Sequence, residues 1–175
     1  TCPMHPQIIR DAPGACPICG MALEPVIPSD EPSAELVDFT RRLWVSVAAA
    51  VPLVILTMGE MIGLPVRDWI GHRAAIWLEF LLATPIVLWA ARPFFRRGLD
   101  SIRNRSPNMW TLISLGVGAA YLYSLVATFL PGIFPDAYRM GQGVGTYFED
   151  AVVIITLVFV GQVLELRARE RTGDA

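Results

Sequence analysis

The sequence contains no lysine, because all 14 of its basic residues are arginine. Charge of either sign is also scarce: 17% of the 175 residues are charged and 54% are hydrophobic, whereas an ordinary soluble domain has about 25% charged residues. This composition excludes a disordered chain and argues against an ordinary soluble enzyme. The net charge of −2 gives no indication of nucleic-acid binding.

Cysteine is the next scarce residue. Three cysteines are too few for a disulfide framework, and an odd number would leave one of them unpaired. All three lie within the first nineteen residues, so we expect them to serve one local site. The chain also begins with Thr1 instead of Met, which predicts that it is a piece of a longer protein.

Long apolar runs are what the sequence does have. Each has about the twenty residues that cross a hydrocarbon core roughly 30 Å thick, and a soluble helix would rarely be apolar all round over such a length. The sequence predicts an all-α integral membrane protein, in which a small Cys/His/Met metal-binding knuckle domain precedes four transmembrane helices. These helices are expected at 43–63, 74–95, 109–131 and 147–166.

The predicted domain organisation follows from shifts in composition. Residues 1–25 would form a heavy-metal-binding domain, and the acidic, proline-broken stretch 26–42 a linker. Residues 43–166 would hold the four transmembrane helices, with a cytoplasmic amphipathic segment at 94–106. The last residues, 167–175, would begin a cytoplasmic connection.

The placement of arginine predicts that both ends of the chain are cytoplasmic. With the N-terminus inside, only Arg67, Arg73 and Arg139 fall on the outer side. The inner side then holds the other arginines, namely Arg10, Arg41, Arg42, Arg92, Arg96, Arg97, Arg103, Arg105, Arg167, Arg169 and Arg171.

Two short Cys/His pairs predict a metal site near the N-terminus. Cys2 with His5, and Cys16 with Cys19, each enclose two residues, and four N/S ligands suit a tetrahedral ion. Without further ligands this set would be a structural zinc knuckle. The thioethers of Met4 and Met21 favour Cu(I) or Ag(I), unless they only pack the small core. Ligand chemistry alone leaves zinc and copper open.

Acidic groups in the last transmembrane run are functional candidates, because ionisable residues in a membrane span are costly. Glu149 lies at the predicted outer end of the run and Glu165 at its inner end. Met109 begins the third run at the depth of Glu165, so the two could accept a soft cation together. The alternative is that Met109 is an interfacial anchor and that Glu165 pairs with Arg167 or Arg169. A further acid, Glu79, is expected to reach the membrane interface.

The segment after Pro93 combines apolar side chains with arginines on one amphipathic stretch. Such a stretch is suited to lie along the cytoplasmic membrane surface. Anchoring to anionic lipid explains the pattern, and the functional alternative is a basic platform for a partner protein. The platform would be formed by Arg96, Arg97, Arg103 and Arg105.

Several longer motifs carry a resemblance to a known family. They are Cys-Pro-Met-His-Pro (2–6), Cys-Pro-Ile-Cys-Gly-Met-Ala-Leu-Glu-Pro (16–25), Leu-Ala-Thr-Pro-Ile-Val-Leu-Trp (82–89), Asn-Met-Trp-Thr-Leu-Ile (108–113), Tyr-Phe-Glu (147–149) and Gly-Gln-Val-Leu-Glu-Leu-Arg-Ala-Arg-Glu (161–170). Over essentially its whole length the chain resembles the N-terminal part of bacterial copper-transporting P-type ATPases. The first motif also occurs in periplasmic adaptor subunits of copper/silver efflux pumps.

The resemblance implies roles for individual residues. Met109 and Glu165 match the residues at the family's intracellular metal entrance, and Glu149 matches a carboxylate on its exit path. The amphipathic stretch would be the platform where a cytoplasmic copper chaperone docks. The family usually has two glycines at the bend of the second span, where this chain has Ala90 and Ala91, so the platform's angle could differ.

The resemblance also implies a function. The chain would be the metal-binding and transmembrane entrance portion of an ATP-driven Cu(I)/Ag(I) exporter in the inner membrane of a bacterium. ATP and Mg would bind only to the full-length protein, because this chain has no phosphorylation or nucleotide-binding motif, and an actuator domain would follow residues 167–175. The alternatives are a free-standing membrane metal-binding or adaptor protein and a related pump for Zn(II) or Cu(II).

Overall fold

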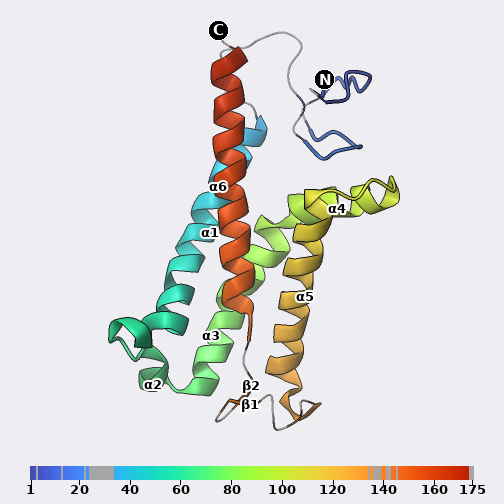
Figure 1. The fold of residues 1–175 in the computed structure, drawn as a ribbon. Helices are drawn as coiled ribbons and strands as arrows, with labels where there is room; N and C mark the ends of the chain where they lie inside the picture. Colours follow the sequence, from blue (N-terminus) through green and yellow to red (C-terminus); the bar gives the residue numbers. More distant parts are fainter. Residues whose placement is uncertain are drawn as a thin grey trace. The chain divides into compact units, whose positions relative to one another are not determined.

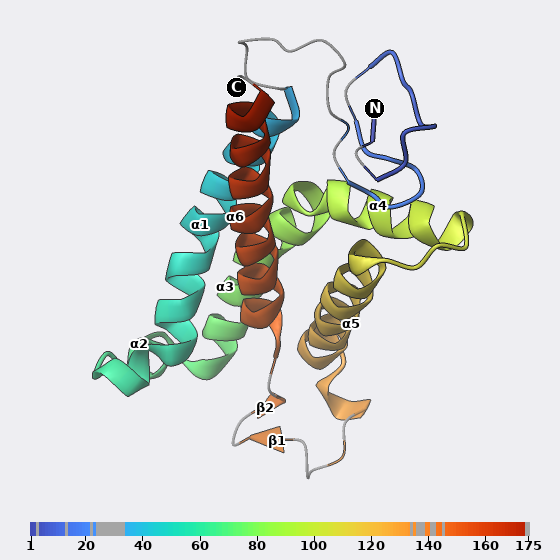
Figure 2. The ribbon, with the colours of Figure 1, turned by 45° about the horizontal axis from the view of Figure 1, so that its top comes forward.

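The computed structural model describes residues 1–2, 4–12, 14–21, 23, 34–133, 135, 139–140, 143–144 and 146–173. Helices dominate this part of the chain (Figure 1 and, in a second view, Figure 2). The elements in order are α1 (Ala34–Met58), the 3₁₀ turn η1 (Gly59–Ile62), α2 (Val66–Ile70), α3 (His72–Pro85), the π turn η2 (Ile86–Ala90), α4 (Arg92–Arg103), α5 (Met109–Phe129), the 3₁₀ turn η3 (Pro131–Ile133), β1 (Arg139–Met140), β2 (Gly143–Val144) and α6 (Phe148–Gly173).

The all-α membrane prediction is confirmed. Within the described residues, four helical segments are long and apolar enough to cross a membrane, namely Glu35–Met58, Arg73–Ala90, Met109–Phe129 and Phe148–Thr172. Strand structure is limited there to the short antiparallel pair of β1 and β2, in which Arg139 is opposite Val144. The protein is therefore a membrane protein built from four hydrophobic helices.

The first helix begins earlier than the sequence suggested. α1 starts at Ala34, inside the stretch expected to be a linker, while residues 26–33 of that stretch lie outside the described part. Leu36 and Phe39 explain the extension, because both side chains are buried and give this turn of the helix an apolar face. The last helix likewise runs on to Gly173, beyond the predicted end of its span.

The second span ends at Ala91 without a glycine. Its last turn is a π turn, in which the Ala91 N–H donates to the Ile86 carbonyl at 2.9 Å. Ala91 has φ −82° and ψ 0°, a conformation that alanine can adopt. Pro93 follows in the first turn of α4, where a backbone N–H would have no acceptor within the helix and proline's lack of one costs nothing. The second span therefore ends at this position although alanine stands where the family usually has glycine.

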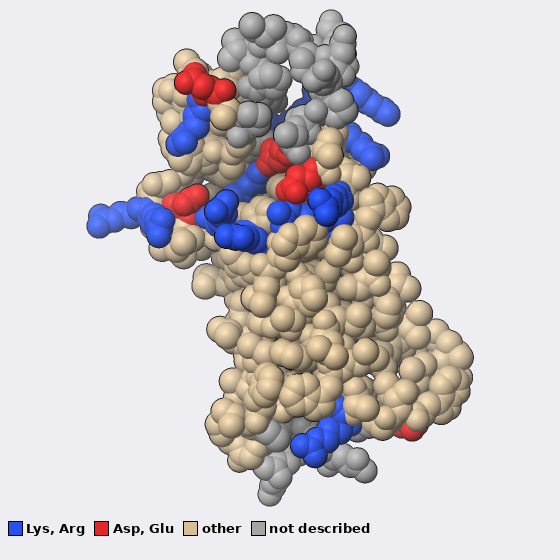
Figure 3. Space-filling view, turned by 180° about the vertical axis from the view of Figure 1, so that it is seen from behind, with Lys and Arg blue, Asp and Glu red and all other residues tan. Residues whose placement is uncertain are grey.

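The chain divides into two compact units. Unit 1 comprises 1–44, 92–115 and 157–175, and unit 2 comprises 45–91 and 116–156. The arginines predicted for the cytoplasmic side all belong to unit 1, whereas Arg67, Arg73 and Arg139 belong to unit 2. In Figure 3 the charged side chains lie in groups, and the surface between these groups carries few of them.

Aromatic rings form the core of unit 1. The Phe94 ring lies 5.1 Å from Trp110 and 4.5 Å from Phe159 between ring centroids. Gly98 allows α4 to approach α5, because a Cβ there would lie 2.9 Å from the Trp110 carbonyl oxygen. The Ser114 hydroxyl, on α5, donates to the Phe94 carbonyl at 3.0 Å. These contacts fix α4 against the start of α5.

Unit 2 has a separate aromatic core. The Phe80 ring lies 5.4 Å from Phe129 and 5.9 Å from Phe148. The Thr84 and Tyr121 hydroxyls are hydrogen-bonded at 2.9 Å, which joins α3 to α5. Edge-to-face ring pairs of this kind add about 0.5–1.5 kcal/mol each beyond area burial.

Candidate metal centre and entrance residues

The first 23 residues, called here the knuckle module, are shaped by two tight turns. In the first, the Ile8 N–H donates to the His5 carbonyl at 2.9 Å. In the second, the Gly20 N–H donates to the Cys16 carbonyl at 2.9 Å, and Gly20 has a φ of +76° that favours glycine. The first turn begins at the predicted ligand His5, and the second contains the predicted ligands Cys16 and Cys19.

The four predicted ligands Cys2, His5, Cys16 and Cys19 meet at one place. Their ligand atoms all lie within 4.8 Å of one another. The Cys2 Sγ lies 3.6 Å from the Cys19 Sγ and 3.7 Å from the His5 Nδ1, and the Cys16 Sγ lies 3.8 Å from the same Nδ1. A tetrahedral ion with bonds of about 2.3 Å to sulfur and 2.0 Å to nitrogen separates its ligands by about 3.5–3.8 Å. The donor set therefore fits a tetrahedral metal ion.

Two thiols of the cluster have shifted pKa values. Burial raises the pKa of Cys2, but hydrogen bonds from His5, the Met4 and His5 backbone and Cys19 outweigh it and lower the pKa to about 6. Burial, aided by the neighbouring Cys2 and Cys16 sulfurs, raises the pKa of Cys19 to about 11 although the Met21 backbone opposes it. One thiol of the cluster is thus prepared as a thiolate, the form that binds metal.

The two predicted thioether ligands differ in exposure. The Met4 side chain is 67% exposed, whereas Met21 is half-buried. The Met21 backbone carbonyl accepts from the Cys16 N–H at 2.7 Å, which ties this residue to the second turn. The role of either sulfur as a ligand stays a prediction.

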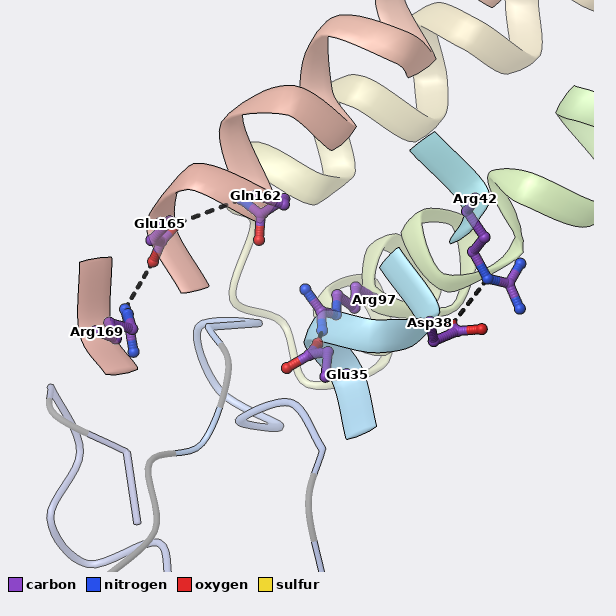
Figure 4. Close-up of polar contacts among 7 residues, drawn as sticks. All are labelled: Glu35, Asp38, Arg42, Arg97, Gln162, Glu165 and Arg169. Carbon is purple, nitrogen blue, oxygen red and sulfur yellow. Dashed lines mark hydrogen bonds and ion pairs between the residues drawn. The ribbon is translucent and has the colours of Figure 1, made fainter. Parts of the chain in front are cut away.

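The carboxylate of Glu165 is held by its own helix (Figure 4). The Arg169 Nη2 donates to its Oε1 at 2.7 Å, and the Gln162 Nε2 donates to its Oε2 at 3.3 Å. The alternative pairing with Arg169 is therefore present, and Gln162 is a neighbour that the sequence argument missed. Met109, also in unit 1, begins α5 with its side chain 54% exposed.

Arg97 lies inside unit 1, although the sequence placed it on an exposed platform. Its side chain is 8% exposed, forms an ion pair with Glu35, and places its guanidinium 5.2 Å from the Phe39 ring and 4.9 Å from the Trp110 ring. Burial lowers the pKa of Arg97 to about 10, against the raising effect of the Glu165 charge. One helical step of about 100° separates it from Arg96, which is exposed together with Arg103 and Arg105.

Of the two acidic residues singled out in unit 2, one departs from expectation. Glu149, the predicted exit carboxylate, is half-buried in the first turn of α6. Glu79 does not reach an interface: it is 1% exposed, and its Oε2 accepts from the Thr146 hydroxyl at 2.7 Å. Only the pairing of α3 with a residue 67 positions away could have revealed this.

Comparison with known proteins places this geometry in a family. A family model described as the heavy metal binding domain matches residues 1–26. Over its whole length the chain is 65% identical to a copper-transporting P-type ATPase of Rhizobium leguminosarum bv. viciae, and it spans 21% of that protein. Over its whole length the chain is thus similar to the N-terminal part of copper-transporting P-type ATPases.

Other P-type ATPases match the whole chain as well. A copper-exporting P-type ATPase of Legionella pneumophila subsp. pneumophila is 51% identical, and the chain spans 24% of it. A silver exporting P-type ATPase of Salmonella typhimurium is also 51% identical, with 22% spanned. The chain therefore covers roughly a quarter of these relatives or less.

Proposed function

We propose that this chain is the metal-receiving and transmembrane entrance part of an ATP-driven exporter of Cu(I) or Ag(I). The observation that carries the proposal is the compact Cys2, His5, Cys16 and Cys19 cluster, with ligand atoms within 4.8 Å of one another. Thiolate and imidazole ligands suit soft ions. The relatives include a copper exporter and a silver exporter, which supports this choice of substrate.

In this proposal, Met109 and Glu165 take the ion at the membrane. A thioether and a carboxylate form a weak, mixed acceptor, which suits an ion that must move on. The 2.7 Å bond from Arg169 occupies Glu165 when no ion is bound, so an arriving cation has to exchange with the guanidinium. Met21, and with it Met4, would assist as soft ligands on the knuckle module.

On the opposite side, Glu149 would lie on the exit path. It stands in the first turn of α6. A carboxylate binds Cu(I) more weakly than thiolates do, which suits release. ATP and Mg would act in the remainder of the ATPase.

The surroundings of the chain complete the proposal. We place it in the inner membrane of a bacterium with both termini cytoplasmic, since unit 1 holds both ends and most of the arginines. The exposed Arg96, Arg103 and Arg105 would form the platform for an acidic partner surface, such as that of a cytoplasmic copper chaperone. The predicted order of domains, 1–25, 26–42, 43–166 and 167–175, is part of the proposal, except that α1 begins at Ala34 and α6 continues to Gly173.

The decisive experiment is an anaerobic Cu(I) competition on the intact chain in detergent. Cys16→Ser/Cys19→Ser removes two ligands, so we expect it to abolish the tightest Cu(I) site. Gln7→Ala, an exposed change in the same module, is the matched control and should bind as the wild type does. Unchanged Cu(I) binding in the cysteine variant would refute the proposal for the module.

A second candidate keeps the fold and changes the metal. Four protein ligands that close a tetrahedral site, with Cys2 and Cys16 buried at 1% and 2% exposure, are typical of structural zinc. Tightly held Zn(II) that Cu(I) cannot displace would make the module a structural knuckle. The transport proposal would then rest on Met109, Glu165 and Glu149.

A further inference from the structure

The second turn of the knuckle module is hydrogen-bonded to the segment between α4 and α5. The Asn104 Nδ2 donates to the Pro17 carbonyl, and the Ser106 hydroxyl donates to the Ile18 carbonyl at 2.6 Å. Pro17 and Ile18 are the two residues enclosed by the ligands Cys16 and Cys19. The segment therefore binds the part of the module whose shape a bound metal fixes.

Trp110 adds an apolar contact beside these hydrogen bonds. Gly20, just after Cys19, lies so close to its indole that an added Cβ would be 2.6 Å from the Nε1 atom. Trp110 is 2% exposed and is the second residue of α5. The module thus contacts Trp110, which directly follows the proposed entrance residue Met109 in the sequence.

A polar cavity of about 120 Å³ lies along the same contact. The module contributes Arg10, Cys16 and Gly20 to its lining, and α4 contributes Arg97 and Asp100. Relative motion is expected at contacts within one chain unless the contact is large and hydrophobic. This contact is polar at its cavity, and Arg97, which lines the cavity, has an Nη1 atom that is buried without a hydrogen-bond partner within the described residues.

We propose that Asn104, Ser106 and Trp110, called here the corner, form a reversible docking site for the chain's own knuckle module. Docking holds the metal centre at the start of α5. Because the corner binds the turn between two metal ligands, docking and metal binding are thermodynamically linked, and a metal-set turn docks more tightly. This inference rests on the proposed function, for which the module must bind metal.

The test is hydrogen–deuterium exchange on the intact chain in nanodiscs. Asn104→Asp/Ser106→Ala removes both donors and sets a carboxylate against the Pro17 carbonyl. We expect amides of residues 15–21 to exchange about tenfold faster, which corresponds to about 1.4 kcal/mol. Asn104→Ala/Ser106→Ala should give a smaller change in the same direction. Unchanged exchange at 15–21 in both variants would overturn the docking proposal.

Two controls separate docking from folding and from metal binding. Ile102→Ala changes an exposed side chain of α4 and should leave exchange at 15–21 as in the wild type. Exchange within α5 and α6 should stay slow in every variant. The linkage predicts that Asn104→Asp/Ser106→Ala binds Cu(I) several-fold more weakly at unchanged stoichiometry, and equal affinity would overturn it. Loss of Cu(I) from the cysteine variant is a separate result and tests the proposed function alone.

Discussion

Units 1 and 2 each bury an ionisable side chain, and they satisfy it in different ways. In unit 1, Arg97 has an ion-pair partner in Glu35 and two aromatic faces around it. In unit 2, the buried Glu79 accepts a hydrogen bond from the Thr146 hydroxyl at 2.7 Å. Losing one partner of a buried ion pair leaves a charge without that partner, whereas losing the Thr146 hydroxyl removes a single hydrogen bond. Unit 1 is therefore expected to be the more sensitive of the two.

Removing Glu35 gives the largest expected effect. Glu35→Ala leaves Arg97 buried without its counter-ion, so the free energy of unfolding should fall by about 3–5 kcal/mol. Chemical denaturation of the chain in micelles, followed by tryptophan fluorescence, measures it. Asp38→Ala, on the same helix, is the matched control: Asp38 is 46% exposed in its pair with Arg42, and its loss should cost at most about 1 kcal/mol. Equal losses in the two variants would contradict the burial argument.

The next largest effect is expected in the pH dependence of stability, through the thiols of the knuckle module. A Cys2 pKa of about 6 makes most of this thiol a thiolate at pH 7, whereas the usual pKa of 9.0 leaves about 1%. Because the folded pKa is depressed, the stability it contributes is present above pH 9 and is lost as pH falls through 6. Cys19, with its raised pKa of about 11, contributes below pH 9 and loses its contribution as pH rises through 11.

Thiolate absorbance near 240 nm checks both values on the metal-free chain under anaerobic conditions. We expect one step near pH 6 that Cys2→Ser abolishes, and one near pH 11 that it shifts. Three steps close to pH 9 would contradict the hydrogen-bonded cluster.

A smaller effect is expected in unit 2. Thr146→Val removes the 2.7 Å bond to the buried Glu79 and should lower the free energy of unfolding by about 1–3 kcal/mol. The control is Thr128→Val, because the Thr128 hydroxyl donates only to the Ser124 carbonyl of its own helix among its described bonds. A Thr146→Val loss as large as that of Glu35→Ala would erase the contrast between the units.

The smallest effect belongs to Arg169. Its partner Glu165 is 41% exposed, and an i,i+4 pair of this kind contributes about 0.5 kcal/mol. Arg169→Ala should thus leave stability almost unchanged, while a Glu165 carboxylate freed from the guanidinium should bind Cu(I) more readily in the competition assay. Arg171→Ala, an exposed change one half-turn on, should do neither. A fall in Cu(I) affinity in Arg169→Ala would count against the exchange at Glu165.

The accuracy of the sequence predictions follows the range of the interactions involved. The pairs Cys2/His5 and Cys16/Cys19 were recognisable because the members of each pair are three positions apart in the sequence, so their proximity is local. Gln162 was missed because a glutamine at i−3 of Glu165 has no distinctive pattern. The start of α1 was placed too late because the apolar contacts of Phe39 come from distant rings.

By itself, the sequence determined the four membrane helices and pointed to the four Cys/His residues that the structure brings together. Long apolar runs must satisfy their backbone within each helix, and the members of each Cys/His pair lie close to one another along the chain. Only the tertiary structure decided that Arg97 and Glu79 are buried and that the module contacts Ser106. Those outcomes depend on partners 62, 67 and 88 positions away in sequence, and composition and periodicity carry no record of such pairings.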